Sequence, residues 1–175
     1  GGAGAAVTVT NSTTSDGTVG IGRQALAALT SGARNLAIGY RAGIAITAST
    51  DNIAIGYDAL LASADTSAHQ NIAIGSYALE TLNSAGARNI AIGFEALETA
   101  NHADVDGNIA IGYKVLDDTG TAAVGHCVGI GDSVLGALNH TDASGTVAIG
   151  SSALGGTDLW YRQCRNRLPS PRCRY

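Results

Sequence analysis

The residues best suited to acid–base or metal chemistry are four histidines, His69, His102, His126 and His140. All four lie in polar stretches, and none has a Ser or Cys at a recurring distance. Two begin the motifs "HAD" and "HTD", but these occur two sequence repeats apart, roughly 10 Å along a stack of strands. One metal ion needs several ligands within bonding distance. The sequence therefore favours solvated loop residues over a metal site.

Other chemical signals are equally weak. The segment "DVDG", from Asp104 to Gly107, resembles part of a calcium loop but lacks the downstream Glu. Cys127 is expected to be a small, buried or semi-buried filler rather than a reactive thiol. The "AIG" glycines are followed by neither a helix nor a Lys, unlike a phosphate-binding loop. We therefore expect no enzyme, no cofactor and no metal.

The dominant feature is a short segment, "NIAIGYDAL" at 52–60, which recurs along the chain. Its Gly falls every 17–19 residues, at positions 22, 39, 56, 75, 93, 112, 131 and 150. Repetition at this period indicates a solenoid, in which each unit buries its apolar face by stacking on its neighbours. The sequence predicts an all-β, parallel β-solenoid (β-roll) of eight coils over residues 18–154.

Each repeat alternates large and small residues, as in Ile53, Ala54 and Ile55. This alternation predicts a short strand with two different faces. We expect the isoleucines to fill a narrow core. The opposite, uniformly small face then suggests close approach by other copies of the chain around an axis. The expected contact residues form an alanine ladder: Ala37, Ala54, Ala73, Ala91, Ala110 and Ala148.

The residues around each strand predict how the chain turns. Gly56 permits a tight or left-handed turn after the strand. Asn52, at the strand entrance, tolerates left-handed backbone, bonds nearby backbone and can form a ladder of amides with its equivalents. Leu60 is expected to close the core from a second strand or turn. The repeat at Ala42 and Gly43 lacks this Leu.

The "N-[IL]-A-I-G" core resembles the head repeats of trimeric autotransporter adhesins, and "AIGYxAL" resembles repeats of phage tail-fibre proteins. The likeness spans residues 18–154. It implies a left-handed β-roll assembled as a homotrimer, with Ile53 and Ile55 inside each protomer and Ala54 facing the trimer axis. The adhesin repeat is shorter, so the extra residues here must form longer loops.

Aromatic residues follow the repeat Gly in several copies. Stacking of the coils would align them in a stripe along one edge, formed by Tyr40, Tyr57, Tyr77, Phe94 and Tyr113. Such a stripe either packs against a neighbouring protomer or loop, or binds a glycan or another partner.

These features favour a structural or adhesive fibre segment, from an extracellular phage tail fibre or a bacterial surface adhesin. Its variable loops would contact a host-surface receptor or glycan. The alternatives are an ice-binding solenoid, for which only "TVT" at 8–10 offers a Thr ladder, and carbohydrate binding through the aromatic stripe. Residues 1–154 carry 5 basic and 13 acidic residues, net −8, which argues against nucleic-acid binding. No apolar run reaches the roughly 18 residues of a membrane-inserted helix.

The chain ends outside the pattern. Residues 1–17 are expected to form a linker or cap, and residues 155–175 form an aberrant tail with 5 basic residues and 1 acidic residue, net +4. Read one nucleotide later, the tail's codons are compatible with "AALTSGTGNVAIGYQALAAGT". That is a ninth repeat, with its Gly at position 167, 17 residues after Gly150. The sequence therefore predicts a frameshifted ninth repeat, and we assign the tail no function.

Overall fold

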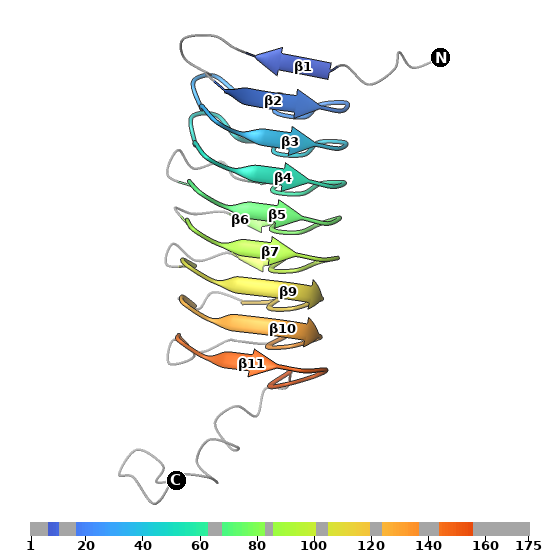
Figure 1. Cartoon of the computed structure of the whole chain (residues 1–175), viewed down its shortest axis with the longest axis vertical. Coiled ribbons are helices and arrows are strands. Elements are labelled where there is room, and N and C mark those ends of the chain that lie inside the picture. Colours follow the sequence, from blue (N-terminus) through green and yellow to red (C-terminus); the bar gives the residue numbers. More distant parts are fainter. Residues whose placement is uncertain are drawn as a thin grey trace, which may run out of the picture.

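The computed structural model describes residues 7–10, 17–62, 68–82, 86–100, 105–119, 124–136 and 144–155. Over these ranges the chain is an all-β, parallel solenoid of about six turns (Figure 1). The described residues form no helix, and hence no apolar helix that could cross a membrane. The expected fold class is confirmed. The count of eight coils, the left-handed winding and the homotrimer stay predictions.

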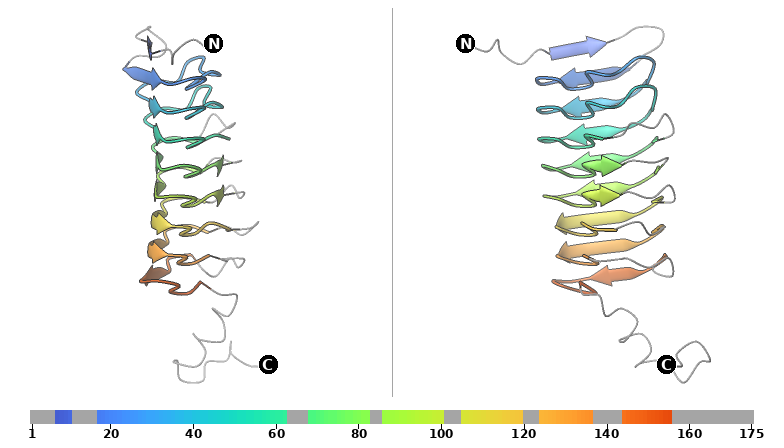
Figure 2. Two further views of the ribbon diagram at one scale, coloured as in Figure 1. Left: turned by 90° about the vertical axis from the view of Figure 1, so that its right-hand side faces the viewer. Right: turned by 180° about the vertical axis from the view of Figure 1, so that it is seen from behind.

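A nine-stranded sheet forms one side of the stack, and its strand order follows the chain. Its strands are β1 (Val7–Thr10), β2 (Thr18–Ile21), β3 (Leu36–Ile38), β4 (Ile53–Ile55), β5 (Ile72–Ile74), β7 (Ile90–Ile92), β9 (Ile109–Tyr113), β10 (Val128–Asp132) and β11 (Val147–Ile149). Only β1 runs antiparallel to its neighbour. Side views show a second limb of chain behind this sheet (Figure 2), where β6 (Thr81–Leu82) pairs with β8 (Thr99–Ala100).

The strands pair with equivalent residues of each repeat in register. Ile53 lies beside Ile72, and Ala54 lies beside Ala73. The same alignment continues from β2 to β11 although the repeats differ in length. Each residue type consequently forms a column parallel to the long axis.

The repeat glycines turn the chain after each strand, as expected. Gly112 has a φ of +130°, and a Cβ added there would lie 1.8 Å from the carbonyl oxygen of Gly131. The equivalent approach recurs at Gly93, where the distance to the Gly112 oxygen would be 2.0 Å. Only glycine allows both the positive φ and the close contact between successive coils.

The asparagines form the expected buried amide ladder, with one correction. The side-chain oxygen of Asn89 accepts the backbone N–H of Asn108 at 3.0 Å and its side-chain N–H at 3.1 Å. The left-handed residue, however, is the one before each Asn, with φ values of 63° at Asp51 and 59° at Arg88. Asn is therefore required for its amide rather than for left-handed backbone.

The two strand faces point opposite to the prediction. The alanine ladder (Ala37, Ala54, Ala73, Ala91, Ala110 and Ala148) lies in the protein interior, whereas the flanking Ile residues are only partly buried, on the outside. Assignment of these alanines to a trimer contact is wrong, because the chain's own core already covers them.

The physical reason lies in the second limb of each coil. Leu60, Leu79, Leu97 and Leu116 are fully buried there, as expected, and they fill the interior from the side opposite the sheet. Only a small residue then fits on the inward side of a strand. In the coil where Val134 replaces the usual Ala of the second limb, Gly129 is the inward strand residue, and Val115 of the preceding coil lies next to it. A Cβ added to Gly129 would lie 2.5 Å from Val115.

The repeat without a Leu keeps the same packing by another route. Gly43 has a left-handed φ of 59°, close to the 51–55° of the equivalent Leu in the other repeats, and Ile46 is fully buried nearby. A Cβ on Gly43 would lie 2.9 Å from Cδ1 of Ile46. The Ile46 side chain therefore fills the space that the missing Leu leaves.

Candidate functional site

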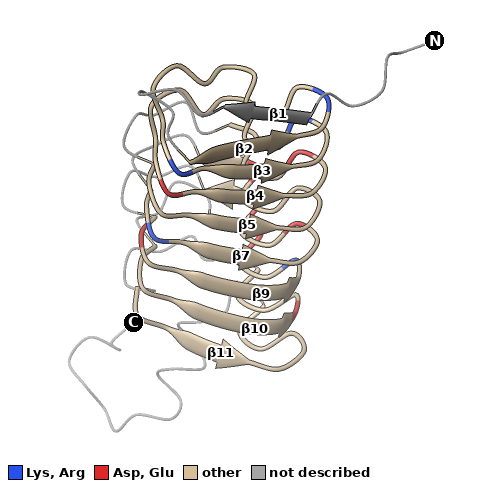
Figure 3. Cartoon of the chain, turned by 45° about the horizontal axis from the view of Figure 1, so that its top comes forward, with Lys and Arg blue, Asp and Glu red and all other residues tan. Residues whose placement is uncertain are grey.

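The outward side of the sheet is a continuous apolar surface. We call it the isoleucine face and define it by the outward strand residues: Val19, Ile21, Leu36, Ile38, Ile53, Ile55, Ile72, Ile74, Ile90, Ile92, Ile109, Ile111, Val128, Ile130, Val147 and Ile149. In-register pairing stacks them in two parallel columns. The charged residues lie at the strand ends, on either side of this face (Figure 3). Each inner member is half-buried by the coils above and below it.

The five predicted aromatic residues form one row along the solenoid, which we call the aromatic row. Successive ring centroids, from Tyr40 through Tyr57, Tyr77 and Phe94 to Tyr113, lie 5.3–5.9 Å apart. Tyr40 stacks on Tyr57 and Phe94 stacks on Tyr113, with interplanar angles of 19° and 10°. Tyr77 meets both of its neighbours edge to face.

This geometry bears on how the aromatic row could bind a ligand. Tyr57, Phe94 and Tyr113 are 44%, 40% and 47% exposed. Within each stacked pair, however, one ring face is covered by the neighbouring ring. Sugar binding by aromatic residues uses open ring faces, whereas ring–ring contacts stabilise the packing of the side chains themselves. The arrangement favours a packing role over a glycan-binding role.

Ion pairs and cations flank the aromatic row. Arg41 pairs with the buried Asp58, and its guanidinium lies 5.2 Å from the Tyr40 ring centroid. At the other end, Lys114 pairs with Glu95 and lies 5.8 Å from the Tyr113 centroid. The Glu95 carboxylate raises the pKa of Lys114 through a hydrogen bond. Both cations therefore stay charged while they contact ring faces.

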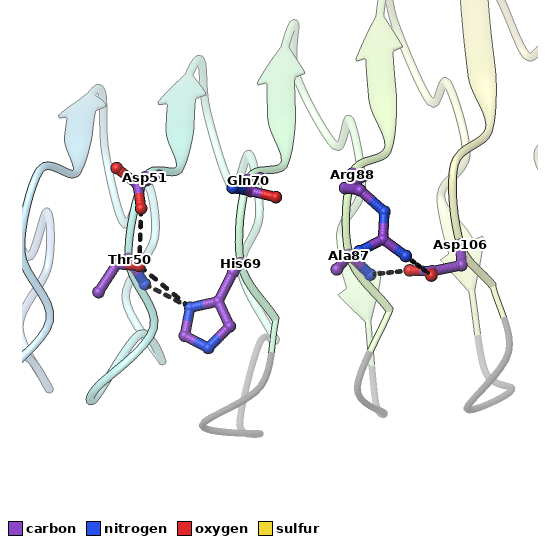
Figure 4. Close-up of a pocket in the computed structure, with 7 residues that line it drawn as sticks. All are labelled: Thr50, Asp51, His69, Gln70, Ala87, Arg88 and Asp106. Atoms are coloured by element: carbon purple, nitrogen blue, oxygen red, sulfur yellow. Dashed lines mark hydrogen bonds and ion pairs between the residues drawn. The ribbon is translucent and has the colours of Figure 1, made fainter.

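A shallow polar pocket opens at the N-terminal ends of the strands, whereas the aromatic row lies at their C-terminal ends (Figure 4). It has a volume of about 450 Å³ and is lined by Thr50, Asp51, His69, Gln70, Ala87, Arg88 and Asp106. The Nδ1 atom of His69 accepts the Thr50 N–H at 2.9 Å. This hydrogen bond joins two adjacent coils, with Nδ1 of His69 as the acceptor.

The carboxylates of this pocket already have partners. Asp51 accepts two hydrogen bonds from Arg34, at 2.6 and 2.8 Å, and one from the Thr50 hydroxyl. These contacts lower the pKa of Asp51 to about 2, chiefly through the Arg34 bond. Asp106 pairs with Arg88 and accepts the Ala87 N–H at 2.7 Å. Both acids tie adjacent coils together, which is a structural role.

The remaining chemically distinctive residues are separated. Cys127 is buried, as expected, and its backbone N–H donates to Asn108. Burial raises the pKa of its thiol. His126 is exposed, in a different coil from His69. His102, His140 and Asp104 lie outside the described residues. Within the described ranges, no three His, Cys, Asp or Glu side chains gather around a point that could hold a metal ion.

The polar pocket is the feature that the sequence reasoning missed. Its signal is present, because the residue before each Asn is often charged, as at Arg34, Asp51 and Arg88. Opposite charges at one position of neighbouring repeats predict ion pairs between coils.

Comparisons of the chain with protein-family models, curated proteins and solved structures find no match.

Proposed function

We propose that this chain is a structural, adhesive segment of an extracellular fibre, either a phage tail fibre or a bacterial surface adhesin. Three copies associate through the isoleucine face. The stacked coils form a stiff scaffold, and the loops that vary between repeats contact a host-surface receptor or glycan. The expected homotrimer is kept, but its protomers contact one another through the isoleucine face instead of the alanine ladder.

The observation that supports it most is the isoleucine face itself. Soluble monomers rarely expose a contiguous apolar surface larger than a few hundred Å². Here two columns of branched residues, without an intervening charge, run from Val19 to Ile149. Burial of apolar surface stabilises an assembly by roughly 25 cal/mol per Å². A second copy with the same regular columns is a natural partner, and the resemblance to trimeric adhesins supplies the number three.

The polar surface supports a scaffold role rather than catalysis. Four basic side chains within the described ranges pair with an acidic side chain of a neighbouring coil, as Arg34 does with Asp51 and Arg41 with Asp58. Such pairs hold the strands in register. Specific recognition is then left to the segments that differ from repeat to repeat.

Sedimentation equilibrium of the intact chain tests the proposal. We expect a particle of three 17.5 kDa chains. Ile92→Asp places a charge at the centre of the isoleucine face and is expected to weaken association at least about tenfold, because a buried charge without a partner is costly.

Ala28→Asp is the matched control, since Ala28 is exposed outside the isoleucine face. It adds the same charge and is expected to leave the mass unchanged. Circular dichroism shows whether each variant keeps its β structure. A monomer of the unaltered chain at micromolar concentration contradicts the assembly, and a dimer contradicts the trimer. Equal effects of both variants contradict the assignment of the contact to the isoleucine face.

A further inference from the structure

The two ends of the solenoid differ in how their strand edges are covered. At the first end, β1 pairs antiparallel with β2 from Val7–Ile21 to Thr10–Thr18. At the last end, β11 pairs only with β10 among the described strands (Figure 1). An uncovered edge presents backbone groups ready to pair with another strand.

The hydrogen bonds between inner coils show which backbone groups of the last coil would bind a further coil. The Val128 N–H donates to the Thr146 carbonyl at 2.8 Å, and the Leu135 N–H donates to the Ala153 carbonyl at 3.1 Å. In return, the Ile130 carbonyl accepts the Gly150 N–H at 2.8 Å.

The equivalent groups in the last coil are the Val147 N–H, the Leu154 N–H and the Ile149 carbonyl. In the register of the inner coils these three groups point away from β10, toward the open end of the stack, and the Leu154 N–H has no backbone hydrogen-bond partner among the described residues. They repeat the pattern by which every inner coil binds the next one. The last coil therefore presents a complete set of groups for one more parallel coil.

The outward side chains of the last coil are also uncovered. Val147 and Ile149 are 63% and 68% exposed, whereas their equivalents in the inner coils are half-buried. A Cβ added to Gly131 would lie 2.8 Å from the Gly150 oxygen, but one added to Gly150 meets no described atom within 4 Å. The space below Gly150 matches the space that a further coil fills elsewhere.

The codons of the tail supply a sequence that fits this space. In the frame one nucleotide later, residues 155–175 can read "AALTSGTGNVAIGYQALAAGT". Its Val-Ala-Ile falls at positions 164–166, in register below Val147, Ala148 and Ile149, and its Gly falls at position 167, 17 residues after Gly150. The small residue would point inward, as the alanine ladder requires.

We propose that the open edge of β11 is the acceptor for a ninth coil of this repeat, which the shifted frame of the tail encodes. A second copy of the chain fits this edge less well. Parallel head-to-tail stacking needs a free edge at the first coil, and β1 occupies that edge. The proposal does not depend on association through the isoleucine face.

Three proteins test it: the intact chain, a chain ending at Gly155, and a chain whose residues 155–175 are replaced by the shifted-frame sequence. Hydrogen exchange of the Val147 and Leu154 amides is measured in each. Amides in a stacked coil exchange only when that coil opens. We expect exchange at least about tenfold slower in the shifted-frame chain than in the other two, and a higher thermal midpoint.

A fourth chain, in which the 21 residues of the shifted-frame sequence follow residue 154 in scrambled order, controls for length and composition. Slowed exchange with the scrambled sequence, or equally fast exchange in all chains, overturns the proposal. Protection in the chain ending at Gly155 that rises with protein concentration also overturns it, because the edge then accepts a second copy. The coding DNA gives an independent check: a shifted frame that does not read Asn-Val-Ala-Ile-Gly contradicts the proposed origin.

Discussion

At the scale of single residues, the repeat glycines set how closely the coils approach. Gly39, Gly56, Gly75 and Gly93 all have φ values between 130° and 139°. A Cβ added to any of them would also lie too close to the carbonyl oxygen of the equivalent glycine in the next coil. The requirement for glycine therefore has two parts, a backbone conformation and a steric contact.

Alanine substitutions at two equivalent positions separate these parts. Gly112→Ala introduces both the unfavourable φ and a clash with the Gly131 oxygen, whereas Gly150→Ala introduces the unfavourable φ without a close described atom. We expect Gly150→Ala to lower the free energy of unfolding by about 1–3 kcal/mol, the usual cost of such backbone strain, and Gly112→Ala to lower it by more.

Urea unfolding of both variants measures the difference. Equal losses of stability would mean that the coils can separate at Gly112 without cost, contrary to the close packing of the glycine column.

At the scale of the strand, the three residues of β7 contribute to two different surfaces. Ile90 and Ile92 face outward and Ala91 faces the leucines of the second limb. The expectation that isoleucine fills the core follows the usual preference of large apolar residues for the interior. It fails here because leucine from the other limb already occupies the narrow interior.

A pair of leucine substitutions tests this orientation. Ala91→Leu adds volume to a fully buried position and is expected to lower the free energy of unfolding by about 1–3 kcal/mol through overpacking. Ile92→Leu keeps the volume of an outward residue and is expected to cost less than about 1.5 kcal/mol.

Denaturant unfolding at several protein concentrations separates folding from association. A tolerated Ala91→Leu combined with a damaging Ile92→Leu would reverse the orientation of the strand.

At the scale of the whole molecule, columns of equivalent residues connect coils that are far apart in sequence. The aromatic row extends over five coils from Tyr40 to Tyr113, and the asparagine ladder runs beside the strands within the core. In a solenoid, stability is approximately the sum of such contacts between neighbours. Long columns therefore stiffen the molecule along its axis.

The aromatic row is tested by replacing Tyr57 and Tyr113 with Ser in one chain. Each substitution removes one stacked partner, and aromatic pairs contribute about 0.5–1.5 kcal/mol beyond their buried area. We expect a lower thermal midpoint and unchanged behaviour in a glycan-binding screen. Glycan binding by the parent chain, lost in a variant of unchanged stability and mass, would instead support the ligand-binding interpretation.

The spacing of the repeats predicted the aromatic row but not the polar pocket. The residues of the aromatic row were identifiable because they follow the repeat Gly, and stacking brings equivalent positions together. His69 and Asp106 both lie two residues before a strand-entrance Asn, but the pocket was not identified because the residue type at that position changes between repeats. Stacking places this position of successive coils side by side, whereas the side-chain contacts made there depend on which residues occupy it.

The sequence by itself determined the period, the strands, the glycine turns and the amide ladder. Each of these depends on the local conformation of a few residues, or on contact between identical positions of adjacent repeats. Only the tertiary structure decided which strand face points inward. Alternation of Ile53, Ala54 and Ile55 creates two faces, but the choice between them depends on the volume left by Leu60 across the coil. Because that volume is small, alanine faces the core and isoleucine faces outward.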